Sequence, residues 1–171
     1  PHVFNRGLER ARGRWVHILP DDDWVRPGFY KALASGLDGD EGIGAAFCRQ
    51  VHVNGRGESR ESLLERQSPG VIDDWLRRIA VSCRLALGSM VVRRQVYERL
   101  GGFSSQAGSA FDWEMWVRIA AHHSVWYEPR ALVVCEKDGE TETDRLVRNG
   151  GQIADSLRAI ELWQRHLPAS L

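Results

Sequence analysis

Three consecutive carboxylates, Asp21, Asp22 and Asp23, end a short apolar run that begins at Trp15. Adjacent carboxylates repel one another, and a bound cation offsets that repulsion. A divalent metal that carries a diphosphate group would serve as this cation. The alternative is that Asp23 caps a turn before a helix that opens at Pro27, while Asp21 and Asp22 are simply solvated.

Asp112 is the second residue whose position could support chemistry. It stands at the start of residues 111–120, in which Trp113, Trp116, Val117 and Ala120 recur at helical spacing. The free amides and the dipole of a helix N-terminus favour an aspartate there, so capping alone would explain it. The same position would also hold an ionised general base at a fixed place.

The acidic triplet must be positioned by the run that precedes it. Four of the five residues 15–19 are apolar, and Pro20 ends the run. This pattern predicts a short, largely buried strand. The carboxylates are therefore expected on the exit loop of a strand, which is where open α/β sheets bind ligands.

The rest of the chain alternates helical and extended patterns. Helices are predicted at residues 5–13, 27–37, 95–100, 111–120 and 143–166, with one more opening at Ser68-Pro69; strands are predicted at residues 43–53, 89–92, 124–127 and 131–135. Residues 56–67 follow the hairpin signal Asn54-Gly55 but are polar, so we expect a mobile surface loop there. The apolar stripe expected for the last helix comprises Leu146, Ile153, Leu157, Ile160 and Trp163.

Composition sets broad limits. Lys plus Arg and Asp plus Glu both number 23, so no net field favours nucleic acid or an anionic membrane. No apolar run approaches the roughly 20 residues of a membrane span, and the N-terminal residues lack the pattern of a secretion signal. We therefore expect a single cytoplasmic domain, residues 1–171. The three cysteines, Cys48, Cys83 and Cys135, indicate buried thiols rather than a disulfide framework.

Several segments, taken in order, resemble the motifs of family 2 glycosyltransferases of the GT-A fold. They are Asn5-x-Gly7, Ala11-x-Gly13, Asp21-Asp22-Asp23-Trp24, Pro27-Gly28-Phe29-Tyr30, residues 93–103 ending in Gly101-Gly102-Phe103, and residues 112–120 beginning with Asp112-Trp113-Glu114. The resemblance covers nearly the whole chain. It implies an α/β fold, a truncated GT-A (Rossmann-like) mixed sheet flanked by helices. It also implies metal-dependent, inverting transfer of a sugar from a nucleotide-sugar donor to a saccharide or other hydroxyl acceptor.

The resemblance also assigns residues to roles. Asp22 and Asp23 match the two carboxylates that close the acidic motif and bind Mg²⁺ or Mn²⁺, and Asp21 takes a more variable place beside the donor diphosphate. Asp112 matches the catalytic base. Asp138 stands where the family often has a His, and its carboxylate could still reach a hard cation. The mechanism requires Asp22 and Asp112 to face one cleft.

The sequence departs from the pattern of this family in two further respects. Phe111 replaces a Glu that commonly precedes the base, and the segment of about 80 to 100 residues that holds the nucleotide, which should precede Asn5, has no match. The chain is thus expected to be the rear part of a GT-A domain, with its metal and acceptor sides.

A sheet without its first strands exposes an edge, and homodimerisation through that edge is one remedy. The alternative function is a non-catalytic remnant that binds a partner there. A phosphohydrolase is a third alternative, but it would need further metal ligands, and the six His residues show no ligand-like spacing.

Overall fold

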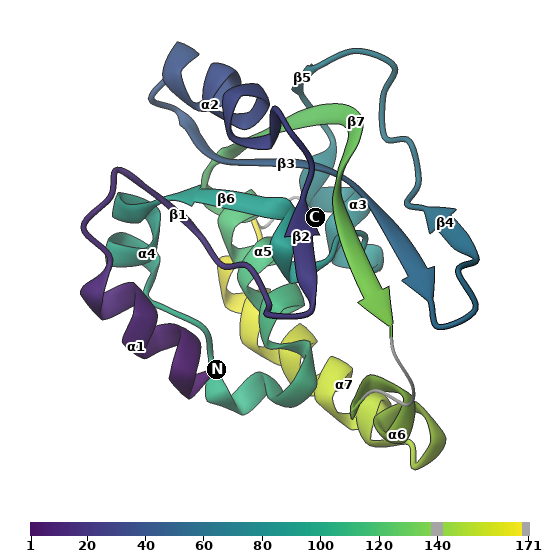
Figure 1. Ribbon diagram of the computed structural model, residues 1–171. Helices are drawn as coiled ribbons and strands as arrows, with labels where there is room; N and C mark the ends of the chain where they lie inside the picture. The colour runs from purple at the N-terminus through teal and green to yellow at the C-terminus, as the bar shows by residue number, and fades with distance from the viewer. Residues whose placement is uncertain (138–141, 169–171) are drawn as a thin grey trace.

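The computed structural model describes residues 1–137 and 142–168 as a seven-stranded mixed sheet with helices on both faces (Figure 1). The helices are α1 (His2–Arg10), α2 (Phe29–Gly39), α3 (Trp75–Val81), α4 (Arg94–Leu100), α5 (Phe111–His122), α6 (Glu142–Arg148) and α7 (Gly151–Trp163), with short 3₁₀ turns η1 (Leu87–Ser89), η2 (Ser105–Ala110) and η3 (Gln164–His166). The strands are β1 (Trp15–His17), β2 (Asp23–Val25), β3 (Ile43–Asn54), β4 (Ser59–Glu61), β5 (Gly70–Val71), β6 (Met90–Arg93) and β7 (Ser124–Lys137).

The strand order is β1-β6-β3-β7-β2, with β4 paired to β3 and β5 paired to β7. The central strands β3 and β7 are parallel, and β1 runs in the same direction because β1 and β3 both pair antiparallel with β6. The chain leaving β1 must therefore cross the carboxyl end of these strands to reach β2 at the opposite edge. This crossing segment carries the acidic triplet.

The two faces of β3 enter different parts of the core. Ala45 and Phe47 contribute to the cluster formed with α3, α4, α5 and α7, whereas Ala46 and Cys48 pack with α2 on the other face. The predicted apolar face of the helix at residues 27–37 is confirmed, because its members Phe29, Leu33 and Leu37 are buried. A sheet covered on both faces in this way is an α/β fold, as the sequence predicts.

The first strand differs from the prediction. Residues 15–19 form only the three-residue β1, which is half-buried rather than largely buried because it lies at the edge of the sheet. The last acid of the triplet begins β2, which the sequence analysis did not predict. A three-residue strand that starts with Asp23 and exposes Trp24 has too little apolar periodicity to be recognised.

The segment 56–67 is not only a loop, because β4 pairs with β3 across the Asn54-Gly55 hairpin. All three residues of β4 are exposed, and a polar edge strand gives no hydrophobic signal. The predicted start of the next helix, at Ser68-Pro69, is also wrong. Gly70 and Val71 pair with β7 instead, and α3 begins only at Trp75.

The two strands predicted at residues 124–127 and 131–135 are one strand, β7. Its register with β3 shifts near Pro129, where Cys48 pairs with Glu128 and the next β3 residue, Arg49, pairs with Ala131. A proline inside a central strand is accommodated at such an irregularity, which explains why the sequence suggests a break.

The C-terminal helix is also divided, into α6 and α7, at Gly150, whose φ of 74° is left-handed. The predicted stripe is wrong at two positions: Ile153 is 68% exposed and Leu157 is 58% exposed. The buried residues of α7 are instead Asp155, Ala159 and Trp163. The break at Gly150 separates α6 from α7, so one stripe does not continue along the whole segment.

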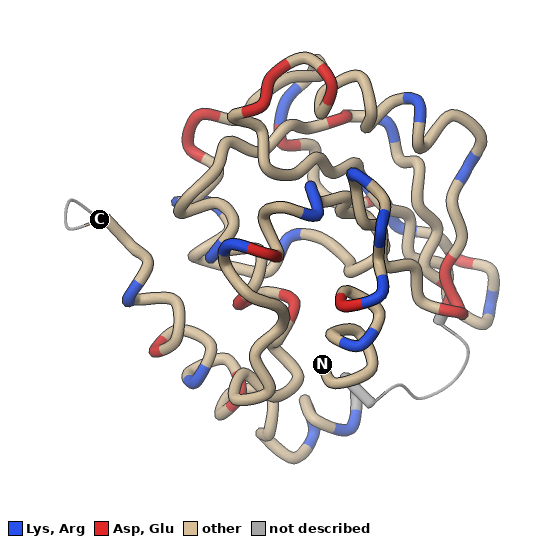
Figure 2. Tube along the Cα trace, turned by 90° about the vertical axis from the view of Figure 1, so that its left-hand side faces the viewer, with Lys and Arg blue, Asp and Glu red and all other residues tan. Residues whose placement is uncertain are grey.

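Acidic and basic residues are interspersed over the chain (Figure 2), in agreement with its balanced charge. None of the described helices combines the length and hydrophobicity of a transmembrane span. Cys48 and Cys135 are buried as predicted, but Cys83 is exposed.

Candidate functional site

The acidic triplet lies at the carboxyl end of the parallel strands. Asp21 and Asp22 form an exposed turn, which is closed by the Asp23 amide donating to the Pro20 carbonyl at 3.3 Å. Asp23 then pairs with Cys135 near the end of β7. The triplet therefore occupies the exit-loop position that the sequence predicts, although its last member is already part of a strand.

Asp23 is half-buried and faces the turn that precedes β6. A Cβ added to Gly88 would lie 3.1 Å from the Asp23 Oδ2 atom, so a side chain at this position would crowd the carboxylate. Burial raises the pKa of Asp23 to about 6; a hydrogen bond with the Cys135 thiol lowers it, and the charge of Asp22 raises it further. A cation held by Asp22 and Asp23 would offset this repulsion, so the pair fits a hard divalent metal.

His17 of β1 supports the same turn. One ring nitrogen, Nε2, donates to the Gly88 carbonyl at 2.8 Å, and the other, Nδ1, lies 3.2 Å from the Tyr30 hydroxyl. Burial lowers the pKa of His17, which favours the neutral ring, whose Nδ1 atom can accept a hydrogen bond from the Tyr30 hydroxyl. The sequence analysis gave His17 no role, because an isolated histidine in a strand carries no motif.

Asp112 is in the first turn of α5, where Ala110 occupies the N-cap position. Its Oδ1 atom accepts a hydrogen bond from the Trp113 amide at 2.7 Å, so the carboxylate does satisfy one free amide of the helix. Burial nevertheless raises the pKa of Asp112 to about 6, although the amides of Trp113 and of Asp112 itself lower it. A half-buried carboxylate with a raised pKa in a cavity is typical of a functional site.

The helix that carries Asp112 is firmly held. Trp116 and Val117 are buried, as the sequence predicts, and the Trp113 indole donates to the Ile79 carbonyl at 2.6 Å. The Trp113 ring also contacts the Trp163 ring of α7, with centroids 4.7 Å apart. These contacts fix the start of α5 against α3 and α7.

Asp112 lines a cavity of about 540 Å³, within the size range of small-molecule sites. The cavity is enclosed by η2, α5, α7 and the segment that follows α3; its lining residues are Val81, Ser82, Cys83, Ser109, Ala110, Asp112, Trp113, Gln152 and Ser156. Ser82 and Cys83 also line a neighbouring cavity of about 570 Å³, which extends to His52 of β3 and to Ala86. The two cavities thus adjoin along one segment, residues 82–86.

Asp23 and Asp112 meet the two ends of the stretch that joins α3 to β6. Asp112 shares its cavity with Ser82 and Cys83, and Asp23 contacts Gly88, six residues after Ser82. The two carboxylates therefore contact opposite ends of the same segment of chain, and a cleft shared by Asp22 and Asp112 stays a prediction. Asp138 lies outside the described residues.

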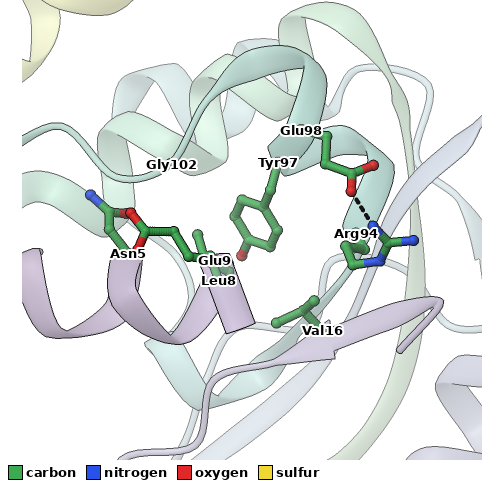
Figure 3. A pocket seen from close by; sticks show the side chains of 8 residues that line it. All are labelled: Asn5, Leu8, Glu9, Val16, Arg94, Tyr97, Glu98 and Gly102. Carbon is green, nitrogen blue, oxygen red and sulfur yellow. Dashed lines mark hydrogen bonds and ion pairs between the residues drawn. The ribbon is translucent and has the colours of Figure 1, made fainter. Parts of the chain in front are cut away.

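Other motif residues have structural roles. The Asn5 side chain donates to the Phe103 carbonyl and accepts from the Phe103 amide, both at 2.8 Å. Figure 3 shows Asn5 of α1 beside Gly102, at one end of a cavity of about 330 Å³ that also contacts Tyr97 and Val16. A side chain at Gly102 would overlap Asn5, so the Asn5 and Gly101-Gly102-Phe103 motifs fit one another.

The Asp112-Trp113-Glu114 block is tied to the same turn. Glu114 and Arg118 form a buried ion pair at 2.8 Å, and Arg118 also donates to the Gly102 carbonyl at 2.7 Å. Phe111, which replaces the acid expected before the base, packs against Phe4 and Phe103 at centroid distances of 5.4 and 5.5 Å. Phe111 is thus part of the aromatic packing between α1 and α5.

Two residues of the Asp112 cavity, Gln152 and Ser156, come from α7 and were not predicted. The sequence analysis placed Ile153 and Leu157 on the inner face of this helix, which is one residue out of phase with the observed face. Asp155, between them, accepts hydrogen bonds from the Ser109 amide and hydroxyl, both at 2.7 Å. The sequence carries no signal for this face, because an aspartate on an amphipathic helix is usually exposed.

Within the residues that the structure describes, no group of three or more His, Cys, Asp or Glu side chains could hold a metal ion. A cation at Asp22 and Asp23 would therefore need further oxygen ligands from a bound anion or water.

No protein-family model matches the sequence. The chain is similar to an uncharacterized protein, MT1568, of Mycobacterium tuberculosis (strain CDC 1551 / Oshkosh), with 23% identity over 176 residues, 91% of this chain and 52% of that protein. Among solved structures it is similar to S. aureus TarS 1-349 in complex with UDP, with a TM-score of 0.60 and 19% identity over 95% of this chain and 49% of that chain. It is also similar to a structure of S. aureus TarS with a TM-score of 0.58 and 20% identity, over 95% of this chain and 30% of that chain.

The chain spans about half the length of the proteins it matches over nearly all of its own sequence, MT1568 and TarS 1-349. At these identities the likeness to TarS concerns the fold. The mixed sheet with flanking helices is an α/β, glycosyltransferase-like fold.

Proposed function

We propose that this chain is the metal and acceptor side of a nucleotide-sugar-dependent glycosyltransferase. The observation that carries the proposal is Asp112: a carboxylate with a pKa raised to about 6, on a rigid helix, in a cavity that adjoins the segment contacted by Asp23. The glycosyltransferase-like fold and the UDP complex of TarS support this reaction class.

In the proposed reaction, the acidic triplet acts on the donor and Asp112 acts on the acceptor. Asp22 and Asp23, with Asp21 beside them, would hold Mg²⁺ or Mn²⁺ on the donor diphosphate, and this cation would neutralise the charge of the leaving nucleoside diphosphate. Asp138 is a further candidate ligand. The raised pKa of Asp23 agrees with a site whose carboxylates need a cation to be ionised together.

Asp112 would act as the general base. Its carboxylate takes the proton of the acceptor hydroxyl while the acceptor oxygen forms a bond to the anomeric carbon of the donor. The bond from that carbon to the diphosphate oxygen breaks, and its electron pair leaves with the diphosphate. Attack from the face opposite the leaving group inverts the anomeric configuration. At neutral pH a base with a pKa of about 6 is mostly ionised and still accepts a proton readily.

Calorimetric titration of the chain with UDP, with and without Mn²⁺, tests the donor side. We expect UDP binding that requires Mn²⁺ and is lost in Asp22→Ala, because the triplet supplies the protein ligands of the cation. Asp112→Asn should retain this binding but lower transfer by about 10² to 10⁴, the usual contribution of a general base. UDP binding that does not depend on Mn²⁺, or that is retained in Asp22→Ala, would contradict the role of the triplet.

One observation favours a second function, a partner-binding or dimerising domain. In the described part of the chain β1 is an edge strand, with β6 as a strand partner on one side only. Unpaired backbone groups at a sheet edge are able to pair with another chain. The non-catalytic alternative predicts association through β1 and no Mn²⁺-dependent binding of UDP.

A further inference from the structure

The residues that α7 contributes to the Asp112 cavity are polar and uncharged. Gln152 and Ser156 are four residues apart on one helix, and both line the cavity together with Ser82. An amide and a hydroxyl both donate and accept hydrogen bonds. In the described part of the chain, neither side chain is assigned a hydrogen-bond partner within the protein, so both are free to bind a ligand.

The position of these two residues is fixed by Asp155, which lies between them on α7. Its carboxylate accepts from both the amide and the hydroxyl of Ser109, at 2.7 Å each. Gly108 makes room for this contact: its φ is +57°, and a side chain there would overlap the Asp155 carboxylate. Ser109 lies two residues before the start of α5, so its hydrogen bonds with Asp155 help to position Gln152 and Ser156 relative to Asp112.

The charge of the residues that line the cavity disfavours anionic ligands. Asp112 is the single charged residue among those that line it, and no Lys, Arg or His is present in this lining. A phosphate group in the cavity would meet an acid and no cation, which is unfavourable. The uncharged lining combines hydroxyl and amide groups with the indole of Trp113, a combination suited to the hydroxyl groups and apolar faces of a sugar.

We propose that this cavity binds an uncharged, polyhydroxylated acceptor, a sugar or a polyol, and that Gln152 and Ser156 determine its specificity by hydrogen bonding to hydroxyl groups next to the one that reacts. The role of this ligand as acceptor rests on the proposed glycosyltransferase function. Its binding to the cavity does not.

The experiment is an NMR titration of the ¹⁵N-labelled chain that follows the indole signal of Trp113. The neutral probes are methyl α-D-glucopyranoside and sorbitol, and glucose 6-phosphate is the charged probe. We expect a saturable shift with at least one neutral probe and binding that is about 2- to 10-fold weaker in Gln152→Ala and in Ser156→Ala, the effect of losing one hydrogen bond each. Gln164→Ala, an exposed glutamine just after α7, should bind as the parent does.

Three results would overturn the proposal: no saturable shift with either neutral probe, binding of glucose 6-phosphate that equals or exceeds that of the neutral probes, or unchanged binding in both α7 variants. UDP and Mn²⁺ binding, measured on the same samples, reports separately on the proposed function. Sugar binding without UDP binding would contradict the glycosyltransferase proposal and support the sugar site. UDP binding without sugar binding would support the glycosyltransferase proposal and contradict the sugar site.

Discussion

The surroundings of Asp112 disfavour the ionised form of its carboxylate. Burial raises its pKa, and the hydrogen bonds from the amides of Trp113 and of Asp112 itself lower it only in part. A residue retained for capping alone would gain stability from its charge, whereas this carboxylate loses stability when it ionises. A measurement of this difference would distinguish the two explanations of Asp112 that the sequence leaves open.

The pH dependence of stability tests this point. A carboxyl group whose pKa rises from its ordinary 3.8 to about 6 on folding binds more protons in the folded state, so its contribution to stability falls as the pH rises between those values. We expect Asp112→Asn to have nearly the parent's unfolding free energy at pH 4 and a value about 1–3 kcal/mol higher at pH 7.5. Urea unfolding at both pH values measures this difference.

Asp73→Asn, at an exposed carboxylate near the start of α3, is the control and should show no such change between the two pH values. If Asp112→Asn lowered stability at pH 7.5, capping would be the better account of Asp112.

At the scale of elements, α7 and η2 are joined by a single buried carboxylate. Asp155 accepts two hydrogen bonds from Ser109 and forms an ion pair with Arg158. The Ser109 hydrogen bonds, followed by Arg158, lower the pKa of Asp155. This contribution to stability is therefore present above its unfolded pKa and is lost as the pH falls through the lower folded value.

Removal of this carboxylate should loosen the site. We expect Asp155→Ala to lower the unfolding free energy by about 2–4 kcal/mol at pH 7, because the Ser109 amide and hydroxyl lose their partner. The difference from the parent should shrink in acid. Glu161→Ala, at an exposed position on the same helix, should change stability by less than about 0.5 kcal/mol. Equal losses in the two variants would show that Asp155 does not join α7 to η2.

The packing of α2 against the sheet depends on a glycine. A Cβ at Gly36 would overlap the indole ring of Trp126 in β7, whereas a Cβ at Gly39, in the last turn of the same helix, would meet no atom within 4 Å. We expect Gly36→Ala to destabilise the protein by about 1–3 kcal/mol despite the better helix propensity of alanine. Gly39→Ala should be neutral or slightly stabilising. Thermal unfolding of both variants compares them, and a stabilising Gly36→Ala would contradict this packing.

At the scale of the molecule, the sheet has an edge at β1. The strand has three half-buried residues, and β6 pairs with one side of it. The cavity between α1, β1 and α4 adjoins this strand at Val16 (Figure 3), and its rim carries Glu9 and Glu98.

If two copies pair through β1, sedimentation should give about 39 kDa, twice the 19.4 kDa of the chain. Val16→Lys places a charge on the edge strand beside Glu9 and Glu98, so we expect a folded monomer. A parent chain that sediments as a monomer at every concentration would contradict pairing through β1 and would remove the observation behind the second candidate function.

The sequence by itself determined the elements that have a strong period and a clear boundary. The helix faces at Phe29, Leu33 and Leu37 and at Trp116 and Val117 are buried as predicted, since apolar side chains at helical spacing must share one side. The exit-loop position of Asp21 and Asp22 also follows from the apolar run and Pro20. The ordered motifs led to a fold class that the structure confirms.

Only the tertiary structure decided which elements meet. The strands β2, β4 and β5 are short and polar or interrupted by glycine, so they depend on pairing with β3 and β7 rather than on a local pattern. The inner face of α7 was mistaken because its buried contact is a carboxylate bonded to Ser109, a partner 46 residues away. The contacts of Asp23 and Asp112 with opposite ends of the segment 82–88, and the cavity that Gln152 and Ser156 line, arise from long-range packing, which no local spacing encodes.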